Sequence, residues 1–207
     1  MLTGEILGLT CLHFGEFERV HTSDPDALMA LGSAIRALSA VPQADLSRLA
    51  IMGVCQTGRL PLVVAASHPV SAALVWYGAA QPREWAVNSK YPRPLDEIIA
   101  EVDCPVLGMF GETDHLISLD DIRRFRDCLD RHGKSYSIHV YRDAPHGWLN
   151  DTMPGRYRRA QAEASWADQR AFLARVLAPG ADRSTRMQRY AADSALDYDF
   201  GRNVRQE

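Results

Sequence analysis

Residues 48–58 have the sequence RLAIMGVCQTG. Residues 48–54 are a short apolar run typical of a buried strand, and residues 58–67 follow as a predicted helix with Pro61 in its first turn. Cys55 therefore occupies a tight turn between a strand and a helix, which is the context of a nucleophile elbow. A side chain in such a turn stands above the sheet, and the positive field of the helix N-terminus favours the thiolate form of cysteine.

The neighbours of Cys55 favour this interpretation but leave an alternative open. The backbone amide of Gln56, one residue past the nucleophile, would supply half of an oxyanion hole. Thr57 stands where the elbow pattern usually has a second glycine, and Gly58 follows it. By spacing alone, a buried cysteine at a strand end beside a capping threonine explains the stretch equally well.

Outside the elbow, apolar runs alternate with helical patterns, and no internal repeat stands out. This alternation predicts an α/β fold, with a mostly parallel sheet covered by helices on both faces. The predicted strands are residues 48–54, 72–78, 105–111 and 135–141, and the predicted helices are residues 24–40, 58–67, 118–132 and 156–177. Asp24 is the expected cap of the first helix, and the proline-rich residues 82–96 are expected to form a surface loop.

The chain divides into three predicted parts. Residues 24–178 form the α/β domain, and residues 1–23 are an atypical N-terminal segment. Residues 179–207 are polar and charged, so we expect a helical or disordered appendage outside the core.

Two further loops follow predicted strands and carry groups that can activate a cysteine. Asp114 ends the sequence GETD at residues 111–114, and His146 lies within DAPHGW at residues 143–148. Carboxyl ends of parallel strands share one edge of the sheet, and the order Cys, Asp, His is the order of α/β-hydrolase triads. A histidine can take the thiol proton and return it to the leaving group, while a carboxylate orients the imidazole and stabilises its charged form.

Each of these residues also has a plainer interpretation. Asp114 can cap the helix that follows, and His146 can be a turn histidine between a proline and a glycine. His115 is a rival base beside Asp114, whereas the other histidines are interpreted as structural or surface residues. Three placements in the right order favour the catalytic interpretation. No cluster has zinc-ligand spacing and there is no glycine-rich phosphate loop, so neither a metal nor another cofactor is predicted.

Composition excludes several classes of function. The chain has 207 residues, a net charge of −3, 46% hydrophobic and 24% charged residues, which predicts a globular protein without nucleic-acid or membrane attraction. The first 20 residues have no positive start, and their apolar run is broken by Gly8 and Thr10, so no signal peptide is predicted. The four cysteines show no paired spacing, and we expect reduced thiols in a cytoplasmic protein.

Four stretches together resemble the dienelactone hydrolase (carboxymethylenebutenolidase) family of the α/β-hydrolases. They are RLAIMGVCQTGRLPLVVAASHP (48–69), ALVWYGAA (73–80), VDCPVLGMFGETDHLIS (102–118) and YRDAPHGWLNDTMPGRY (141–157). The resemblance covers roughly residues 24–178. It implies hydrolysis of a small ester, lactone or thioester through a thioester acyl-enzyme, with Cys55 as nucleophile, Asp114 as acid and His146 as base.

Three departures from the family pattern qualify this expectation. The N-terminus is too short for the family's first strands, which carry the second oxyanion donor and a glutamate that contacts the resting thiol. Thr57 replaces the elbow glycine. Asn150 stands where the archetype has an arginine for the substrate carboxylate; Arg59 and Arg83 are possible substitutes, and dienelactone itself is a doubtful substrate.

The shortened sheet would expose a strand edge, so we expect a homodimer or another partner that covers it. Alternatively, the sequence is a fragment of a longer reading frame. Tyr77 and Trp148 are candidates for substrate contacts. Two other functions remain open: a catalytically weak or inactive interaction subunit, because one oxyanion donor is worth about a hundred- to a thousandfold in rate, and, ranked last, a redox sensor built on Cys55.

Overall fold

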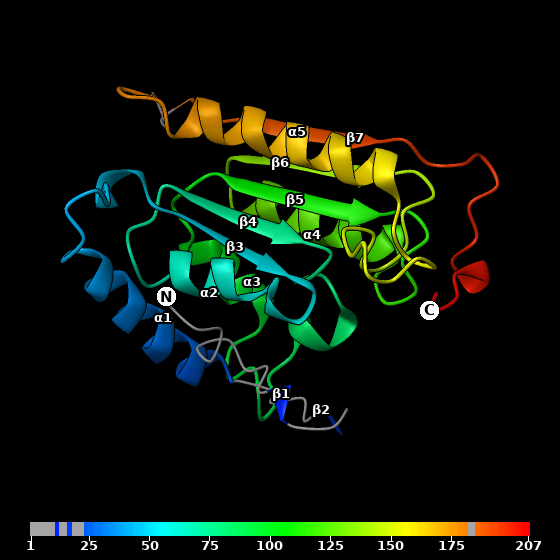
Figure 1. Ribbon diagram of the computed structural model, residues 1–207, viewed down its shortest axis with the longest axis horizontal. Coiled ribbons are helices and arrows are strands. Elements are labelled where there is room, and N and C mark those ends of the chain that lie inside the picture. Colours follow the sequence, from blue (N-terminus) through cyan, green and yellow to red (C-terminus); the bar gives the residue numbers. More distant parts are fainter. Residues whose placement is uncertain (1–10, 13–15, 18–22, 182–184) are drawn as a thin grey trace.

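The computed structural model describes residues 11–12, 16–17, 23–181 and 185–207. Its centre is a five-stranded sheet in the order β3-β4-β5-β6-β7, in which every neighbouring pair is parallel (Figure 1). The five strands are Ala50–Val54, Ala72–Trp76, Val106–Gly111, Tyr136–Tyr141 and Gln188–Ala192. A separate antiparallel pair is formed by β1 (Cys11–Leu12) and β2 (Glu16–Phe17).

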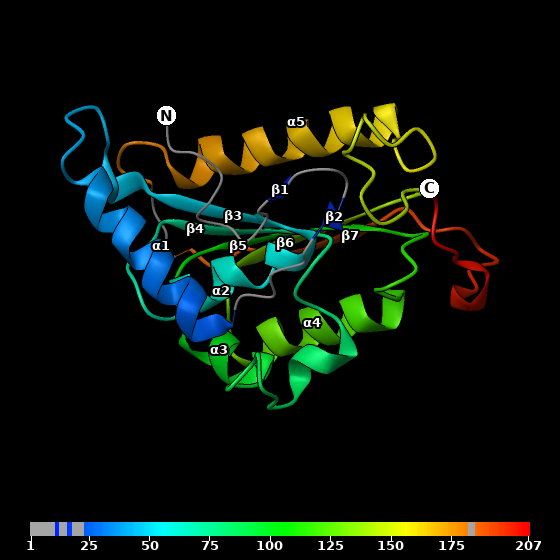
Figure 2. The ribbon, with the colours of Figure 1, turned by 60° about the horizontal axis from the view of Figure 1, so that its bottom comes forward.

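Helices cover both faces of the sheet, which confirms the predicted α/β architecture. Figure 2 shows α5 (Arg159–Val176) alone on one face, while α2 (Leu60–Ala65), α3 (Leu95–Glu101) and α4 (Leu119–Arg131) lie on the other. The helix α1 (Asp24–Leu38) packs against α2.

The sheet separates two apolar cores. Every residue of β4, β5 and β6 is buried, because helices cover these central strands on both sides. The core towards α5 contains Trp76 and Phe172, and the core towards α2, α3 and α4 contains Phe110 and Phe125, whose rings meet edge to face at 5.9 Å. Full burial of each such side chain contributes about 1.5–3 kcal/mol.

Local capping explains where α4 begins and ends. The Ser118 hydroxyl accepts a hydrogen bond from the Asp121 amide, and the Asp121 carboxylate accepts one from the Ser118 amide, as in a capping box. Gly133 stops the helix with a φ of 62°. Both ends agree with the sequence prediction.

Other boundaries differ from the prediction. The cap of α1 is Ser23 rather than Asp24, because the serine hydroxyl accepts the Asp26 amide. The proline-rich stretch 82–96 contains the short 3-10 helix η4 (Pro82–Trp85) and the start of α3, and is not a plain loop. The helix after Cys55 is also shorter than the predicted 58–67, since α2 spans Leu60–Ala65, and the 3-10 turn η3 (Cys55–Thr57) precedes it.

The polar C-terminal region corrects the expectation of an appendage outside the core. Residues Gln188–Ala192 form β7, which pairs in parallel with β6 along its length. β7 lies at the edge of the sheet, and its mostly exposed side chains explain why its sequence lacks an apolar signal. The division of the chain at residues 23 and 178 stays a prediction, and most of the 1–23 segment lies outside the described residues.

None of the helices in the described part of the chain is both long and apolar enough to cross a membrane.

Candidate active site

Cys55 lies in a strained turn at the carboxyl end of β3. Its φ is 56°, in the left-handed region that costs a non-glycine residue on the order of 1–3 kcal/mol. Cys55 is an exposed residue, and its contact with His146 is partly buried. The strand, the sharp turn and the exposed cysteine are the geometry that the sequence predicted for a nucleophile elbow.

Close backbone contacts explain the glycines around this turn. A Cβ atom on Gly53 would collide with the carbonyl oxygen of Thr57. A Cβ atom on Gly58 would lie 2.7 Å from the Cα atom of Gly78, which follows β4. Gly58 therefore performs the close approach that the elbow pattern assigns to a glycine one position earlier.

Thr57 contributes a hydrogen bond that a glycine lacks. Its hydroxyl accepts a hydrogen bond from the Val54 amide at 2.9 Å and donates one to the Val54 carbonyl oxygen at 2.9 Å. The side chain thus closes the turn beneath Cys55, and the departure from the family pattern leaves the elbow intact.

The structure brings together the three residues predicted as a triad. The Nε2 atom of His146 lies 3.0 Å from the Sγ atom of Cys55, and the Nδ1 atom of His146 lies 2.8 Å from the Oδ2 atom of Asp114. His146 is 5% exposed and Asp114 is 1% exposed. Cys55 is therefore reachable from solvent as a residue, while the histidine and the carboxylate behind it are shielded.

These contacts shift the proton from sulfur towards the ring. Burial alone would raise the pKa of the Cys55 thiol, but the hydrogen bond and charge of His146 outweigh it and lower that pKa. Burial alone would lower the pKa of His146, but the bonds to Asp114 and Cys55 raise it to about 9. A thiolate beside an imidazolium is the arrangement that cysteine nucleophiles use.

The Gln56 amide is directed at the reacting atom. Its backbone N–H hydrogen-bonds the Cys55 sulfur and lowers the pKa of the thiol. An N–H in this position is available to an oxyanion formed on a carbonyl carbon attached to the sulfur.

Hydrogen bonds that the sequence does not predict hold the loop that contains Asp114. The Oδ1 atom of Asp114 accepts the amides of Leu116 and Ile117, which fixes the carboxylate. The Asn203 side-chain amide donates to the carbonyl oxygens of Glu112 and Asp114 at 3.1 and 3.0 Å. Asn203 lies in the C-terminal region without a recognisable motif, so no sequence signal could place it here.

The buried carboxylate of Glu112 links the loop that contains Asp114 to the loop that contains His146. It accepts the amide of Asp143, whose φ of 55° marks the sharp turn that leads to His146, and also the amide of Ala195. Glu112 is 3% exposed. The sequence GETD contained this residue, but only its position reveals the bridging role.

The candidate substrate residues differ in their placement. Tyr77 is buried and its ring meets His146 edge to face at 5.1 Å, so it contacts the base. Trp148 has no exposed surface and packs between Trp76 and Tyr141, which corrects the expectation that it contacts substrate. The rival base His115 lies 5.8 Å from the His146 ring, measured between centroids.

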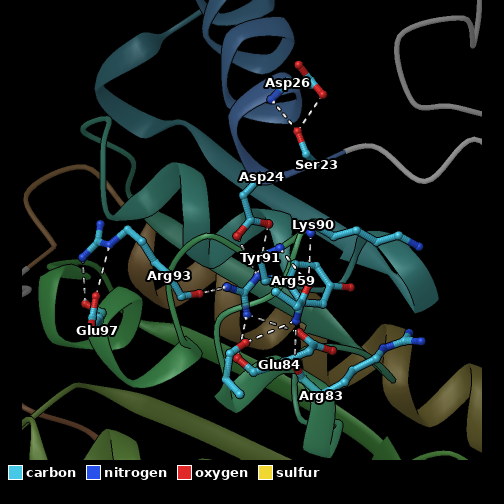
Figure 3. A network of polar contacts seen from close by, with 12 residues as sticks. Ser23, Asp24, Asp26, Arg59, Arg83, Glu84, Lys90, Tyr91, Arg93 and Glu97 are labelled. Carbon is cyan, nitrogen blue, oxygen red and sulfur yellow. Dashed lines mark hydrogen bonds and ion pairs between the residues drawn. The ribbon is translucent and has the colours of Figure 1, made fainter.

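Arg59 does not replace the substrate-binding arginine. It is 2% exposed, its Nε atom pairs with Asp24 at 3.0 Å, and it donates to the Glu84 carbonyl oxygen (Figure 3). Its guanidinium also lies over the Tyr91 ring at 4.4 Å. This buried network fastens the start of α2, behind the elbow, to α1 and to the loop before α3. Arg83 is exposed, so its position leaves that prediction open.

Comparisons with known proteins extend over most of the described domain. The family model for the dienelactone hydrolase family matches residues 16–177. A protein of Methylorubrum extorquens, provisionally named a carboxymethylenebutenolidase, is 32% identical over 144 residues, which are 69% of this chain and 48% of that protein. One of Escherichia coli O157:H7 with the same provisional name is 34% identical over 59% of this chain and 44% of its own length.

Solved structures of other proteins resemble this chain in their fold. A provisionally named dienelactone hydrolase from Klebsiella pneumoniae has a TM-score of 0.67 at 28% identity, over 73% of this chain and 62% of that one. A dienelactone hydrolase-like promiscuous phosphotriesterase from metagenomic libraries has a TM-score of 0.61 at 18% identity, over 73% of this chain and 62% of that chain. The chain spans about half the length of the curated relatives it matches.

Proposed function

The chain belongs to the dienelactone hydrolase family, and on that premise we propose that it hydrolyses small esters, lactones or thioesters with Cys55 as nucleophile. The observation that carries this proposal is the continuous chain of contacts from Cys55 through His146 to Asp114, with Cys55 at a positive φ. In this proposal Asp114 orients the ring, and His146 moves protons between sulfur, substrate and water.

The first half of the reaction acylates the cysteine. The Cys55 thiolate attacks the substrate carbonyl carbon, and the carbonyl oxygen becomes an oxyanion that accepts the Gln56 amide. The tetrahedral intermediate then collapses, the carbon–oxygen bond to the leaving group breaks, and the imidazolium of His146 protonates the departing alkoxide. A thioester on Cys55 and a neutral His146 remain.

The second half returns the enzyme to its starting state. Neutral His146 takes a proton from water, and the resulting hydroxide attacks the thioester carbonyl. Breaking the carbon–sulfur bond releases the carboxylic acid and regenerates the Cys55 thiolate beside the imidazolium. No redox step and no cofactor enters this scheme. Tyr77, which contacts the His146 ring, would help to hold the ring in place during both halves.

A model-ester assay tests the proposal. Purified protein should hydrolyse p-nitrophenyl acetate, and mass spectrometry of the quenched reaction should detect an acetyl group on the peptide that contains Cys55. We expect Cys55→Ala to lower kcat/KM by at least about a thousandfold, whereas Cys104→Ala, at a buried cysteine away from the triad, should retain turnover. Equal activity of Cys55→Ala and the wild type would refute the proposal.

We propose in addition that a second copy of the chain or another partner covers β3. Within the described residues β3 pairs only with β4, and Met52 on it is 43% exposed. Unpaired strand edges of this kind favour association. Light scattering of the purified protein should give at least twice the mass of 23.0 kDa, and a monomer at micromolar concentration would argue against self-association. A cytoplasmic location, in which Cys55 stays reduced, remains part of the proposal.

A further inference from the structure

A second group of metal-ligating side chains joins α3 to α4. Asp96 lies in the first turn of α3, while Cys128 and His132 lie one helical turn apart at the end of α4. A carboxylate oxygen, the sulfur and a ring nitrogen of these residues all lie within 4.8 Å of one another. None of the three belongs to the catalytic machinery proposed above.

The donor types and their spacing match zinc. A thiolate, an imidazole and a carboxylate are the ligands that Zn²⁺ takes from proteins, at about 2.0–2.3 Å from the ion in a tetrahedral arrangement. The i, i+4 spacing of Cys128 and His132 places both on the same side of α4. We propose that Asp96, Cys128 and His132 bind one Zn²⁺ ion, with water in the fourth position.

The present contacts are compatible with such an ion. The Nε2 atom of His132 lies 2.7 Å from the Oδ1 atom of Asp96, while Arg131 pairs with the other carboxylate oxygen. An ion would replace the hydrogen bond between His132 and Asp96 and leave the Arg131 pair in place. The His132 side chain is 27% exposed, which gives an ion a route from solvent.

The thiol must lose its proton when the ion binds. Cys128 is buried, and its sulfur lies within 4.8 Å of an Asp96 carboxylate oxygen. Coordination deprotonates a thiol outright, and the proton passes to solvent. The carboxylate and the new thiolate then balance the two charges of Zn²⁺.

The proposed site lies far from the triad. Because α4 leads from the end of β5 back to the start of the parallel strand β6, its last turn lies near the amino ends of the strands. Cys55, Asp114 and His146 lie beyond the carboxyl ends, at the opposite edge. The proposed ion would fasten α3 to α4 without entering the reaction.

Cobalt absorption tests the site directly. The experiment uses the Cys55→Ser variant, so that the thiol of Cys55 cannot bind the probe. This variant is titrated with Co²⁺. We expect one equivalent of Co²⁺ to produce the near-ultraviolet charge-transfer band of a single thiolate ligand, together with visible bands of tetrahedral intensity. Zn²⁺ added afterwards should remove these bands and raise the Tm of the protein.

Matched variants distinguish this site from other cysteines. Adding Cys128→Ser should abolish the charge-transfer band, and adding His132→Gln, at a partly exposed position, should weaken Co²⁺ binding more than tenfold. Adding Cys104→Ser should leave the titration unchanged, and circular dichroism checks that each variant is folded. Absence of the band in the Cys55→Ser protein, or its persistence in folded Cys128→Ser protein, would overturn the proposal.

Discussion

The Sγ atom of Cys55 and the Nε2 atom of His146 lie 3.0 Å apart, although 91 positions separate the two residues in the sequence. The contact lowers the pKa of the cysteine and contributes to raising that of the histidine to about 9. Between these two pKa values the pair exists as a thiolate and an imidazolium. In the proposed reaction, this contact would govern both the reactivity of the sulfur and the transfer of its proton.

The pH dependence of Cys55 alkylation should reveal this pair. We expect iodoacetamide to react with Cys55 at pH values where an ordinary thiol, with a pKa of about 8.5, is mostly protonated. In His146→Asn the midpoint should move up towards that ordinary value, because the stabilising charge is gone. The rate is measured by mass spectrometry of the Cys55 peptide from pH 5 upwards.

His115→Gln is the matched control for this experiment. Its ring lies beside His146, but the contact with sulfur comes from His146. The alkylation midpoint should therefore stay where it is in the wild type. A shift as large as that of His146→Asn would instead make His115 the base.

Ester hydrolysis should decline at alkaline pH for a related reason. Protonation of the leaving group requires the imidazolium of His146, which is lost as the pH rises through about 9. We expect the alkaline limb of kcat/KM against pH to fall in this region, with the acid limb set by the lowered pKa of Cys55. A profile that rises steadily past pH 10 would contradict the proton transfer from His146.

The hydroxyl of Thr57 should stabilise the elbow. Thr57→Ala removes both bonds to Val54, so we expect the free energy of unfolding to fall by about 1 kcal/mol. Thr57→Ser keeps the hydroxyl and should lose less. Urea denaturation measures both variants, and equal stabilities of the serine and alanine variants would show that the hydroxyl contributes nothing.

Asn203 should act as a positioning residue for the loop that contains Glu112 and Asp114. Asn203→Ala leaves the carbonyl oxygens of Glu112 and Asp114 without this donor, so we expect kcat to fall by roughly tenfold with little change in KM. The alkylation midpoint of Cys55 should also rise, because His146 is held less firmly. The exposed neighbour Arg202 provides the control: Arg202→Ala should change neither quantity.

The buried network around Arg59 should make stability depend on pH. Burial raises the pKa of Glu84 from 4.5 to about 7, so folding favours its protonated form. This contribution is fully present below pH 4.5 and is lost as the pH rises through 7, which amounts to on the order of 3 kcal/mol.

Glu84→Gln isolates this effect. Above pH 7 the free energy of unfolding, measured by urea denaturation, should be higher for the variant than for the wild type. The difference between the two free energies should shrink towards pH 4.5. Glu97→Gln, on exposed α3 surface beside Arg93, should show no such trend. A Glu84→Gln variant that is destabilised above pH 7 and matches the wild type at pH 4.5 would contradict this, because it would show that the ionised Glu84 stabilises the fold as a charged partner of Arg59.

The sequence predicts the central fold because the signals for its strands and helices are local. Apolar runs predict four of the strands, and the cap and the terminal glycine predict the limits of α4. Likeness to the Klebsiella structure and the family model confirms the predicted α/β-hydrolase fold. Cys55, Asp114 and His146 each follow a predicted strand, now β3, β5 and β6, and this is enough to predict that they meet at one edge of the sheet.

Features that depend on distant contacts were not predictable. β7 is an edge strand with exposed side chains, so its five residues carry no apolar pattern. Asn203 acts through backbone carbonyls that any residue could supply. Arg59 looked available for a substrate, and only the position of Asp24 shows that it is already paired. Trp148 lay next to the base in sequence, but its ring turns into the core.

The path of the C-terminal region has a practical meaning for how the protein is divided and labelled. The family match stops at residue 177, yet β7 and Asn203 come later. Trimming to the match would remove the strand that pairs with β6 and the Asn203 side chain that donates to the loop of Asp114. The backbone of Glu207 packs against Gly155, so a purification tag fused after Glu207 would lie close to the loop that follows His146. The segment that matches the family model therefore ends before the last strand of the sheet.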